Sequence, residues 1–286
     1  MNLKEIYTAK KEPVISYEVF PPKDDTDGEK LETLFEELNK LLCYKPSLIS
    51  VTYGAGGSNR NESVEIIRRI KKELNVTPMP HFTCVSTSTK NISEYLKTIE
   101  SFDVKNILAL RGDLPKDGNV CHDFKHADEL VDYIKANTNL SVAVAGYPEG
   151  HKECESFEKD LNYLKQKVEK GAEVIFSQMF FNNEHYFSFV EKCAKLGITQ
   201  PVIPGILPVS NYKQLFKMAD MCRVEIPTKL KETLERHKDD SDYTKKYGIE
   251  YASHQCSELL QNKVRGLHFY TLNKSYAVGQ ILKNIL

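Results

Sequence analysis

The chain has 286 residues, of which 41% are hydrophobic and 28% charged. This length and composition are typical of one large α/β barrel or of two smaller domains, with a core that needs neither disulfides nor a structural metal. With 39 Lys and Arg against 40 Asp and Glu, the net charge is −1, which argues against a nucleic acid or an acidic membrane as partner.

Seven cysteines occur along the chain, and none of them forms a C-x-x-C pair. Their odd number and irregular spacing indicate reduced thiols in an intracellular protein. Neither they nor the eight histidines show metal-ligand spacing, so no metal site is expected. Residues 1–13 contain no apolar signal core, and no apolar run approaches the roughly 18 residues that a membrane span needs. We therefore expect a cytoplasmic protein without a membrane partner.

Short apolar runs alternate along the chain with longer amphipathic runs, which predicts strands followed by helices. In chain order, the strand and helix of each unit are expected at residues 14–20 and 29–43, 48–52 and 61–74, 78–84 and 90–102, 106–110 and 126–137, 142–147 and 157–170, 174–177 and 183–195, 201–206 and 211–219, and 266–271 and 275–286. The mostly polar stretch at residues 226–263 predicts two additional helices, one before and one after the charged segment DDSDYTKKYG at residues 239–248. Within it, the charge run at residues 238–242 is expected to be a solvated loop.

Eight successive βα units predict a closed (β/α)₈ barrel as one domain over residues 1–286, with extra helices before the eighth strand. The predicted strands are short and rich in Val and Ile, as parallel strands covered on both faces are. A doubly wound open sheet is the alternative. It is weakened because no G-x-G-x-x-G follows a strand.

Polar residues recur where the predicted strands end, which in an α/β barrel is the face that carries the active site. From the first strand to the eighth they are Glu18, Thr52, His81, Arg111-Gly112-Asp113, Tyr147, Gln178 and Tyr270-Thr271. Acid, amide, hydroxyl and guanidinium groups are therefore expected to converge on one mouth.

Glu18 is the sharpest candidate because it stands inside an apolar strand. A buried carboxyl group tends to keep its proton, and a general acid near neutral pH needs that proton. For Glu18, a solvent-facing side chain or a buried ion pair is the structural alternative.

Three further candidates have both a functional and a structural interpretation. Asp113 is either a carboxylate of the site or a turn residue. His81 is a ligand, a base or a structural histidine. The glycine-rich loop at residues 53–58 either offers backbone N–H groups to a phosphate or is only a turn.

At these same residues the chain resembles the methylenetetrahydrofolate reductase family. Matching segments run in order from residue 17 to residue 273 and so cover nearly the whole chain. They are residues 17–22 (YEVFPP), 51–58 (VTYGAGGS), 80–84 (PHFTC), 108–113 (LALRGD), 147–151 (YPEGH), 178–181 (QMFF), 204–209 (PGILPV) and 268–273 (HFYTLN). Each is moderately specific, and together they are strongly specific.

The resemblance implies a barrel that holds FAD non-covalently and reduces methylenetetrahydrofolate to methyltetrahydrofolate in a ping-pong reaction. The electrons come from NADH, NADPH or a protein electron donor. Because the bridging carbon must become an electrophilic iminium, the N10 amine has to leave with a proton, and by resemblance Glu18 supplies it. Asp113 looks like the carboxylate beside the flavin and the pterin. Gln178, Gln214 and Lys274 match folate-contacting positions, Lys274 where the family often has Arg.

The flavin-binding positions of the family fall on Thr52, Tyr53, Ala55, His81, Arg111, Gly112, Asp113, Ala127, Tyr147, His151, Cys154, Asp160, Tyr163, Gln166 and Lys167. The chain departs from better-studied members at Tyr163 and Gln166, where they have Asn and Arg, and at Met218, where some have Phe stacked on the donor. The resemblance also implies a homo-oligomer. Because the chain ends with the barrel, inhibition by adenosylmethionine is not expected.

Two rival functions remain open from the sequence. Another FAD-binding barrel oxidoreductase, of the proline dehydrogenase type, shares the barrel and the flavin but needs neither an acid at Glu18 nor the folate contact of Gln178. A non-catalytic barrel that binds folate or a partner subunit does not need Glu18 and Asp113 together.

Overall fold

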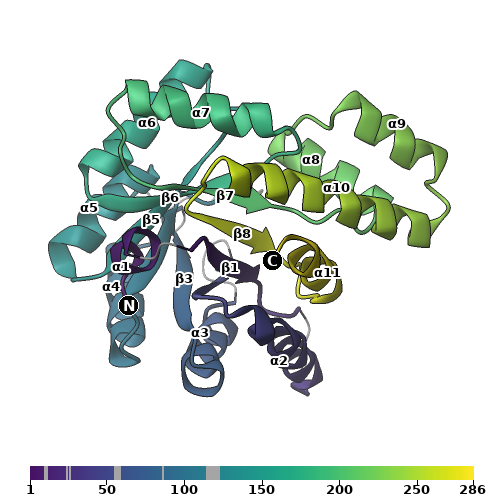
Figure 1. Cartoon of the computed structure of the whole chain (residues 1–286). Coiled ribbons are helices and arrows are strands. Elements are labelled where there is room, and N and C mark those ends of the chain that lie inside the picture. The colour runs from purple at the N-terminus through teal and green to yellow at the C-terminus, as the bar shows by residue number, and fades with distance from the viewer. Residues whose placement is uncertain (10–11, 24, 26, 55–58, 86, 114–122) are drawn as a thin grey trace.

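The computed structural model describes residues 1–9, 12–23, 25, 27–54, 59–85, 87–113 and 123–286. In these ranges eight strands form a closed parallel barrel (Figure 1). They are β1 (Val14–Val19), β2 (Leu48–Val51), β3 (Thr77–Thr83), β4 (Asn106–Leu110), β5 (Ser141–Gly146), β6 (Ala172–Met179), β7 (Val202–Ile206) and β8 (Gly266–Tyr270). Each strand pairs with its sequence neighbours, and β1 pairs with β8 to close the ring. The barrel predicted from the βα periodicity is confirmed.

A helix follows each strand and covers the outside of the barrel. These helices are α2 (Glu29–Leu41), α3 (Arg60–Arg69), α4 (Thr89–Ser101), α5 (Ala127–Asn137), α6 (Phe157–Glu169), α7 (Asn183–Lys195), α8 (Tyr212–Cys222) and α11 (Tyr276–Ile285). A 3₁₀ turn at Leu42–Tyr44 extends α2, and a π-helical turn at Ile70–Leu74 extends α3. The main core lies between the helices and the outward faces of the strands, where Tyr17 and Val19 of β1 are fully buried. The alternate residues of each strand face the barrel interior.

Two helices, α9 (Thr228–Arg236) and α10 (Ser241–Gln261), precede β8, and α10 packs against α11 and α7 (Figure 1). The prediction that the second helix follows the charged segment was wrong, because α10 begins inside it. The Asp240 side chain accepts the N–H of Tyr243 at 2.9 Å, so the charge run expected as a loop contains a helix N-cap. Gly248 lets α10 approach the chain after β7 closely, since a Cβ there would lie 1.9 Å from the Val209 carbonyl oxygen.

A helix that was not predicted from the sequence, α1 (Leu3–Thr8), lies at the N-terminal end of the barrel. Its buried residues Leu3, Ile6 and Tyr7 join the interior cluster formed by residues of the strands. The Leu3 N–H donates to Ser141 Oγ at 3.2 Å, at the first residue of β5, so α1 closes the bottom of the barrel. The available signal was the capping box of Asn2 and Glu5, which both make their reciprocal hydrogen bonds.

Within the described ranges, every helix falls short of the length and apolarity that a membrane span requires.

Candidate functional site

The C-terminal ends of the strands surround a cavity of about 370 Å³, which we call the mouth cavity. Predicted site residues from six strands or their following loops line it: Glu18, Thr52, Tyr53, His81, Gly112, Asp113, Tyr147 and Gln178. Met218, Cys222, His268 and Tyr270 line it as well. Acid, amide, hydroxyl and imidazole groups therefore do meet at one end of the barrel.

Glu18 reaches into the mouth cavity from β1, and its side chain is 20% exposed. One carboxylate oxygen, Oε2, lies 3.6 Å from Nε2 of His81 and 3.9 Å from Nε2 of His268. Burial lowers the pKa of His81 to about 4, against the opposing effect of Glu18, so this imidazole is neutral at neutral pH. The backbone carbonyl of Glu18 accepts the Thr271 hydroxyl at 2.7 Å, which anchors the end of β1 beside β8.

Asp113 extends beyond the end of β4, and its side chain is 79% exposed at the rim. Gly112 makes the preceding turn with φ of +87°, and a Cβ there would lie 2.9 Å from Cβ of Thr83. The glycine is therefore required both by the backbone conformation and by the close approach of β3. Lys152 Nζ lies 3.5 Å from the Asp113 carboxylate and gives it a cationic neighbour.

A second cavity of about 210 Å³, which we call the cradle, lies over the ends of β4 and β5 and between α5 and α6. Predicted flavin-binding residues form much of its wall: Arg111, Ala127, Tyr147, His151, Cys154, Asp160, Tyr163 and Lys167. The cradle and the mouth cavity share Leu110, Ala145 and Tyr147, so the two adjoin.

The cradle contains buried charge of both signs. Lys167 Nζ donates to the Ala145 carbonyl at 2.7 Å, and burial lowers its pKa to about 8 while Asp160 and Asp128 oppose the shift. Burial raises the pKa of Asp160. Its carboxylate also accepts a hydrogen bond from the backbone N–H of His151 at 3.1 Å. Burial and the nearby Arg111 guanidinium lower the pKa of His151. The cradle thus combines Lys167 and Arg111, two groups that bind phosphate oxygens.

Glu153 adds a carboxylate to the wall of the cradle, and the sequence analysis did not predict it as a site residue. Its Oε2 accepts a hydrogen bond from an Arg111 guanidinium nitrogen at 2.5 Å, at the wall of the cradle. The side chains are 24% exposed for Arg111 and 39% exposed for Glu153. An anionic side chain therefore stands where an anionic ligand of Arg111 would lie.

Three of the predicted residues that the structure describes do not appear in these walls. Gln166, Gln214 and Lys274 are exposed and line neither cavity as far as the structure describes the chain. Ala55 lies outside the described residues. His268, in contrast, was missed as a site residue although it lies two positions before Tyr270, so strand alternation places both side chains on the interior face.

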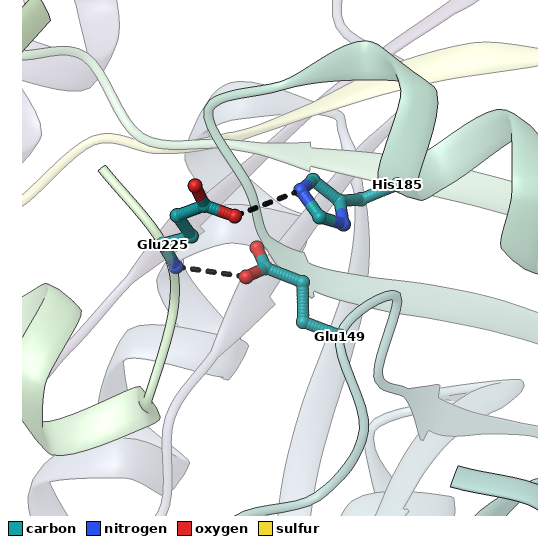
Figure 2. A group of neighbouring side chains, drawn as sticks. All are labelled: Glu149, His185 and Glu225. Atoms are coloured by element: carbon teal, nitrogen blue, oxygen red, sulfur yellow. Dashed lines mark hydrogen bonds and ion pairs between the residues drawn. The ribbon is translucent and has the colours of Figure 1, made fainter. Parts of the chain in front are cut away.

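A separate group of side chains ties the loop after β5 to the chain after α8, and Figure 2 shows how they face one another. The backbone N–H of Glu225 donates to the Glu149 carboxylate at 2.8 Å, and His185 Nε2 lies 3.4 Å from the Glu225 carboxylate. Burial raises the pKa of Glu149, and the neighbouring Glu225 adds to the shift. Glu149 Oε2 and the Glu225 carboxylate have partners within the protein, whereas Glu149 Oε1 is buried without a hydrogen-bond partner among the described residues. We interpret this group as a structural link between the two segments.

Comparison with known proteins agrees with this arrangement. The family model described as methylenetetrahydrofolate reductase matches residues 3–286. The chain is 38% identical over 293 residues to "Methylenetetrahydrofolate reductase (NADH) 1" of Arabidopsis thaliana, covering 97% of this chain and 49% of that protein. It is 36% identical over 271 residues to "5,10-methylenetetrahydrofolate reductase" of Escherichia coli (strain K12), covering 94% and 90%. The chain therefore spans about half the length of the plant relatives.

A solved structure has a fold similar to that of this chain. An uncharacterized protein from Clostridium thermocellum, which binds two copies of 5-methyl-5,6,7,8-tetrahydrofolic acid, matches with a TM-score of 0.70 at 12% identity, covering 99% of this chain and 97% of that one. At this identity the match supports the barrel fold alone. The family model, which spans nearly all of the sequence, and the identity to the plant and bacterial relatives assign the family: this chain belongs to the methylenetetrahydrofolate reductase family.

Proposed function

We propose that this protein reduces 5,10-methylenetetrahydrofolate to 5-methyltetrahydrofolate, using FAD and electrons from NADH or NADPH. One observation carries the proposal: Glu18, Asp113 and Gln178 line the same cavity, which adjoins the phosphate-binding groups of the cradle. NADH is favoured as donor because the names of the plant relatives specify it. Homo-oligomer formation and a single domain over residues 1–286 stay predictions.

The residues of the two cavities fit FAD in their chemistry. A dinucleotide is long enough to need both of these adjoining cavities, and Lys167 and Arg111 lie in the wall of the cradle. Thr52, Tyr53, His81, Gly112 and Tyr147 would surround the ring system in the mouth cavity, and the remaining cradle residues would hold the phosphates and the adenosine. FAD supplies a carrier that takes hydride from one substrate and gives it to another.

The residues of the chain supply the proton chemistry and the electrostatics. Glu18 is the general acid that delivers a proton to N10 of the folate as the bridging carbon becomes an iminium. The Asp113 carboxylate stabilises that cation from the rim of the mouth. Gln178 uses its side-chain oxygen to accept the Met179 N–H at 2.9 Å, which fixes the amide where it meets the substrate.

The decisive experiment is anaerobic. Purified protein loaded with FAD should be bleached by NADH or NADPH, and the bleached protein should regain its yellow colour when methylenetetrahydrofolate is added. A colourless protein that does not bind added FAD would contradict the proposal and favour a non-catalytic barrel. A protein that is bleached but not reoxidised by the folate would favour another flavin-dependent barrel oxidoreductase.

The affinity for FAD should depend on pH through Lys167. Only the ammonium form attracts a phosphate, so affinity should be full below pH 8 and fall as pH rises through the pKa of about 8. Lys167→Met should weaken binding about 10-fold and abolish this pH dependence. Quenching of flavin fluorescence from pH 6 to 9.5 measures both, and Lys165→Met, on the same helix, is the control. A wild-type affinity that stays flat over this range would refute the role of Lys167.

Replacing Glu153 should tighten FAD binding. Since its carboxylate already pairs with Arg111, a phosphate must displace it, and Glu153→Gln removes that competition. The expected gain is about 3-fold in Kd, because a partly exposed ion pair is worth roughly 0 to 1 kcal/mol. Glu155→Gln, in the same loop but paired with Lys159, should leave the Kd unchanged. Weaker binding by Glu153→Gln would show that Glu153 supports the ligand instead.

A further inference from the structure

A line of polar groups runs inside the barrel from the bottom helix α1 to Glu18. Tyr7 of α1 donates its hydroxyl hydrogen to Ser16 Oγ at 3.2 Å. Ser16 Oγ lies 2.9 Å from Nδ1 of His268, and Nε2 on the other side of that ring faces the Glu18 carboxyl oxygen at 3.9 Å. Tyr7, Ser16 and His268 are at most 1% exposed, so no bulk water serves these groups.

Counting donors and acceptors limits the hydrogen positions in this line to a few arrangements. Ser16 has one hydrogen and two lone pairs. The Leu267 carbonyl at 3.3 Å can only accept and is one of two possible acceptors of this hydrogen; the other is Nδ1 of His268 at 2.9 Å. Burial raises the pKa of Tyr7, so this hydroxyl stays protonated and its hydrogen occupies one lone pair of Ser16. When Ser16 donates to Leu267, its remaining lone pair accepts from His268, and Nδ1 then carries the hydrogen.

We propose that Ser16, supported by Tyr7, fixes His268 in the tautomer with hydrogen on Nδ1, and that His268 thereby acts as a positioning residue for proton transfer by Glu18. In this tautomer Nε2 presents a lone pair to Glu18. A protonated carboxyl group donates to that lone pair, whereas a carboxylate is repelled by it. The separation of 3.9 Å leaves the contact to tighten when substrate binds or to pass through one water.

The other groups around Glu18 are compatible with this positioning role. His81 Nε2 is buried without a hydrogen-bond partner and lies 3.6 Å from the same oxygen, Oε2. If these two contacts shorten to hydrogen-bond distance, a carboxyl O–H oxygen can accept from an N–H of His81 while donating to His268. Tyr270 of β8 stays neutral because burial raises its pKa well above the usual value. Asp113 lines the same cavity from the loop after β4.

The effect of His268 on the folate reaction rests on the proposed function. The tautomer of His268 can be tested without it. Protein labelled with ¹⁵N-histidine distinguishes the two tautomers of His268 by the shifts of its ring nitrogens, with no substrate or flavin present. We expect Nδ1–H in the wild type. Ser16→Ala removes the acceptor of that hydrogen, so the ring should change to Nε2–H, which donates to a Glu18 carboxylate and stabilises the charged form.

The same variants test the effect on Glu18. In Ser16→Ala the pH at which the folate half-reaction falls to half its rate should drop by about one unit, because a hydrogen bond to an ionised group now favours the carboxylate. Flavin binding should stay as in the wild type. Ser16→Thr keeps the hydroxyl and should restore both the tautomer and the pH profile. Ser50→Ala is the matched control, since Ser50 Oγ is buried in the neighbouring strand without a hydrogen-bond partner.

The outcomes separate the inference from the proposed function. An Nε2–H tautomer in the wild-type protein overturns the inference by itself, even if Ser16→Ala does not fold. An unchanged tautomer and pH profile in a folded Ser16→Ala overturns it as well. A wild-type protein with the Nδ1–H tautomer that does not reduce methylenetetrahydrofolate would overturn the proposed function and leave the tautomer assignment standing.

Discussion

Replacing Glu18 by Gln should lower the rate of methylenetetrahydrofolate reduction by about 10²-fold or more, while reduction of bound FAD by NADH stays within a few-fold of the wild type. Gln keeps the size and much of the hydrogen bonding of the side chain but has no transferable proton. Only the folate half-reaction needs a proton at N10, so only its rate should fall. A loss of rate confined to this half-reaction is therefore diagnostic of a general acid.

Stopped-flow measurement of the two half-reactions gives the two rates separately. Glu173→Gln is a suitable control, because Glu173 is a partly buried glutamate of β6 that binds Ser141 and Lys135 at the opposite end of the barrel. It should leave both rates near those of the wild type. Normal folate reduction by Glu18→Gln would refute the general-acid assignment. An equal fall in both half-reactions would point to a structural role in the mouth.

Replacing Asp113 by Asn should have a different signature, because Asp113 is assigned an electrostatic role. Loss of a negative charge beside the flavin should raise the midpoint potential of bound FAD, so reduction by NADH holds steady or becomes faster. The folate half-reaction should slow by on the order of 10-fold or more. The iminium cation loses its counter-charge, and the reduced flavin, at a higher potential, donates hydride less readily. Lys152 would also lose its carboxylate partner at 3.5 Å.

Redox titration measures the potential independently of both rates. Asp242→Asn makes the same change of charge at a residue of α10 whose side chain is 92% exposed, and it should leave the potential unchanged. An unchanged potential in Asp113→Asn would show that this carboxylate does not act on the flavin. If Asp113→Asn lowered the rate of flavin reduction but left folate reduction normal, Asp113 would act in the flavin half-reaction instead of the folate half-reaction.

Most of the fold was predictable because each element carries its own pattern. The predicted strand at residues 106–110 and the predicted helix at residues 183–195 have the same bounds in the structure, at Asn106–Leu110 and Asn183–Lys195. The largest omission, α1, has only six residues, and its apolar side chains are explained only by the interior cluster that they join. The start of α10 was misplaced because a helix N-cap and a solvated loop share the same polar residues.

The sequence by itself determined the order of the βα units, and with it the end of the barrel at which Glu18, His81, Asp113, Tyr147 and Gln178 meet. Strand ends are local features, so their polar residues can be read one at a time. Only the tertiary structure decided which side chains touch. Ser16 and His268 lie 252 positions apart, and their contact at 2.9 Å exists because β1 pairs with β8 when the barrel closes. The pairing of Arg111 with Glu153 likewise depends on how two loops pack, which no local periodicity encodes.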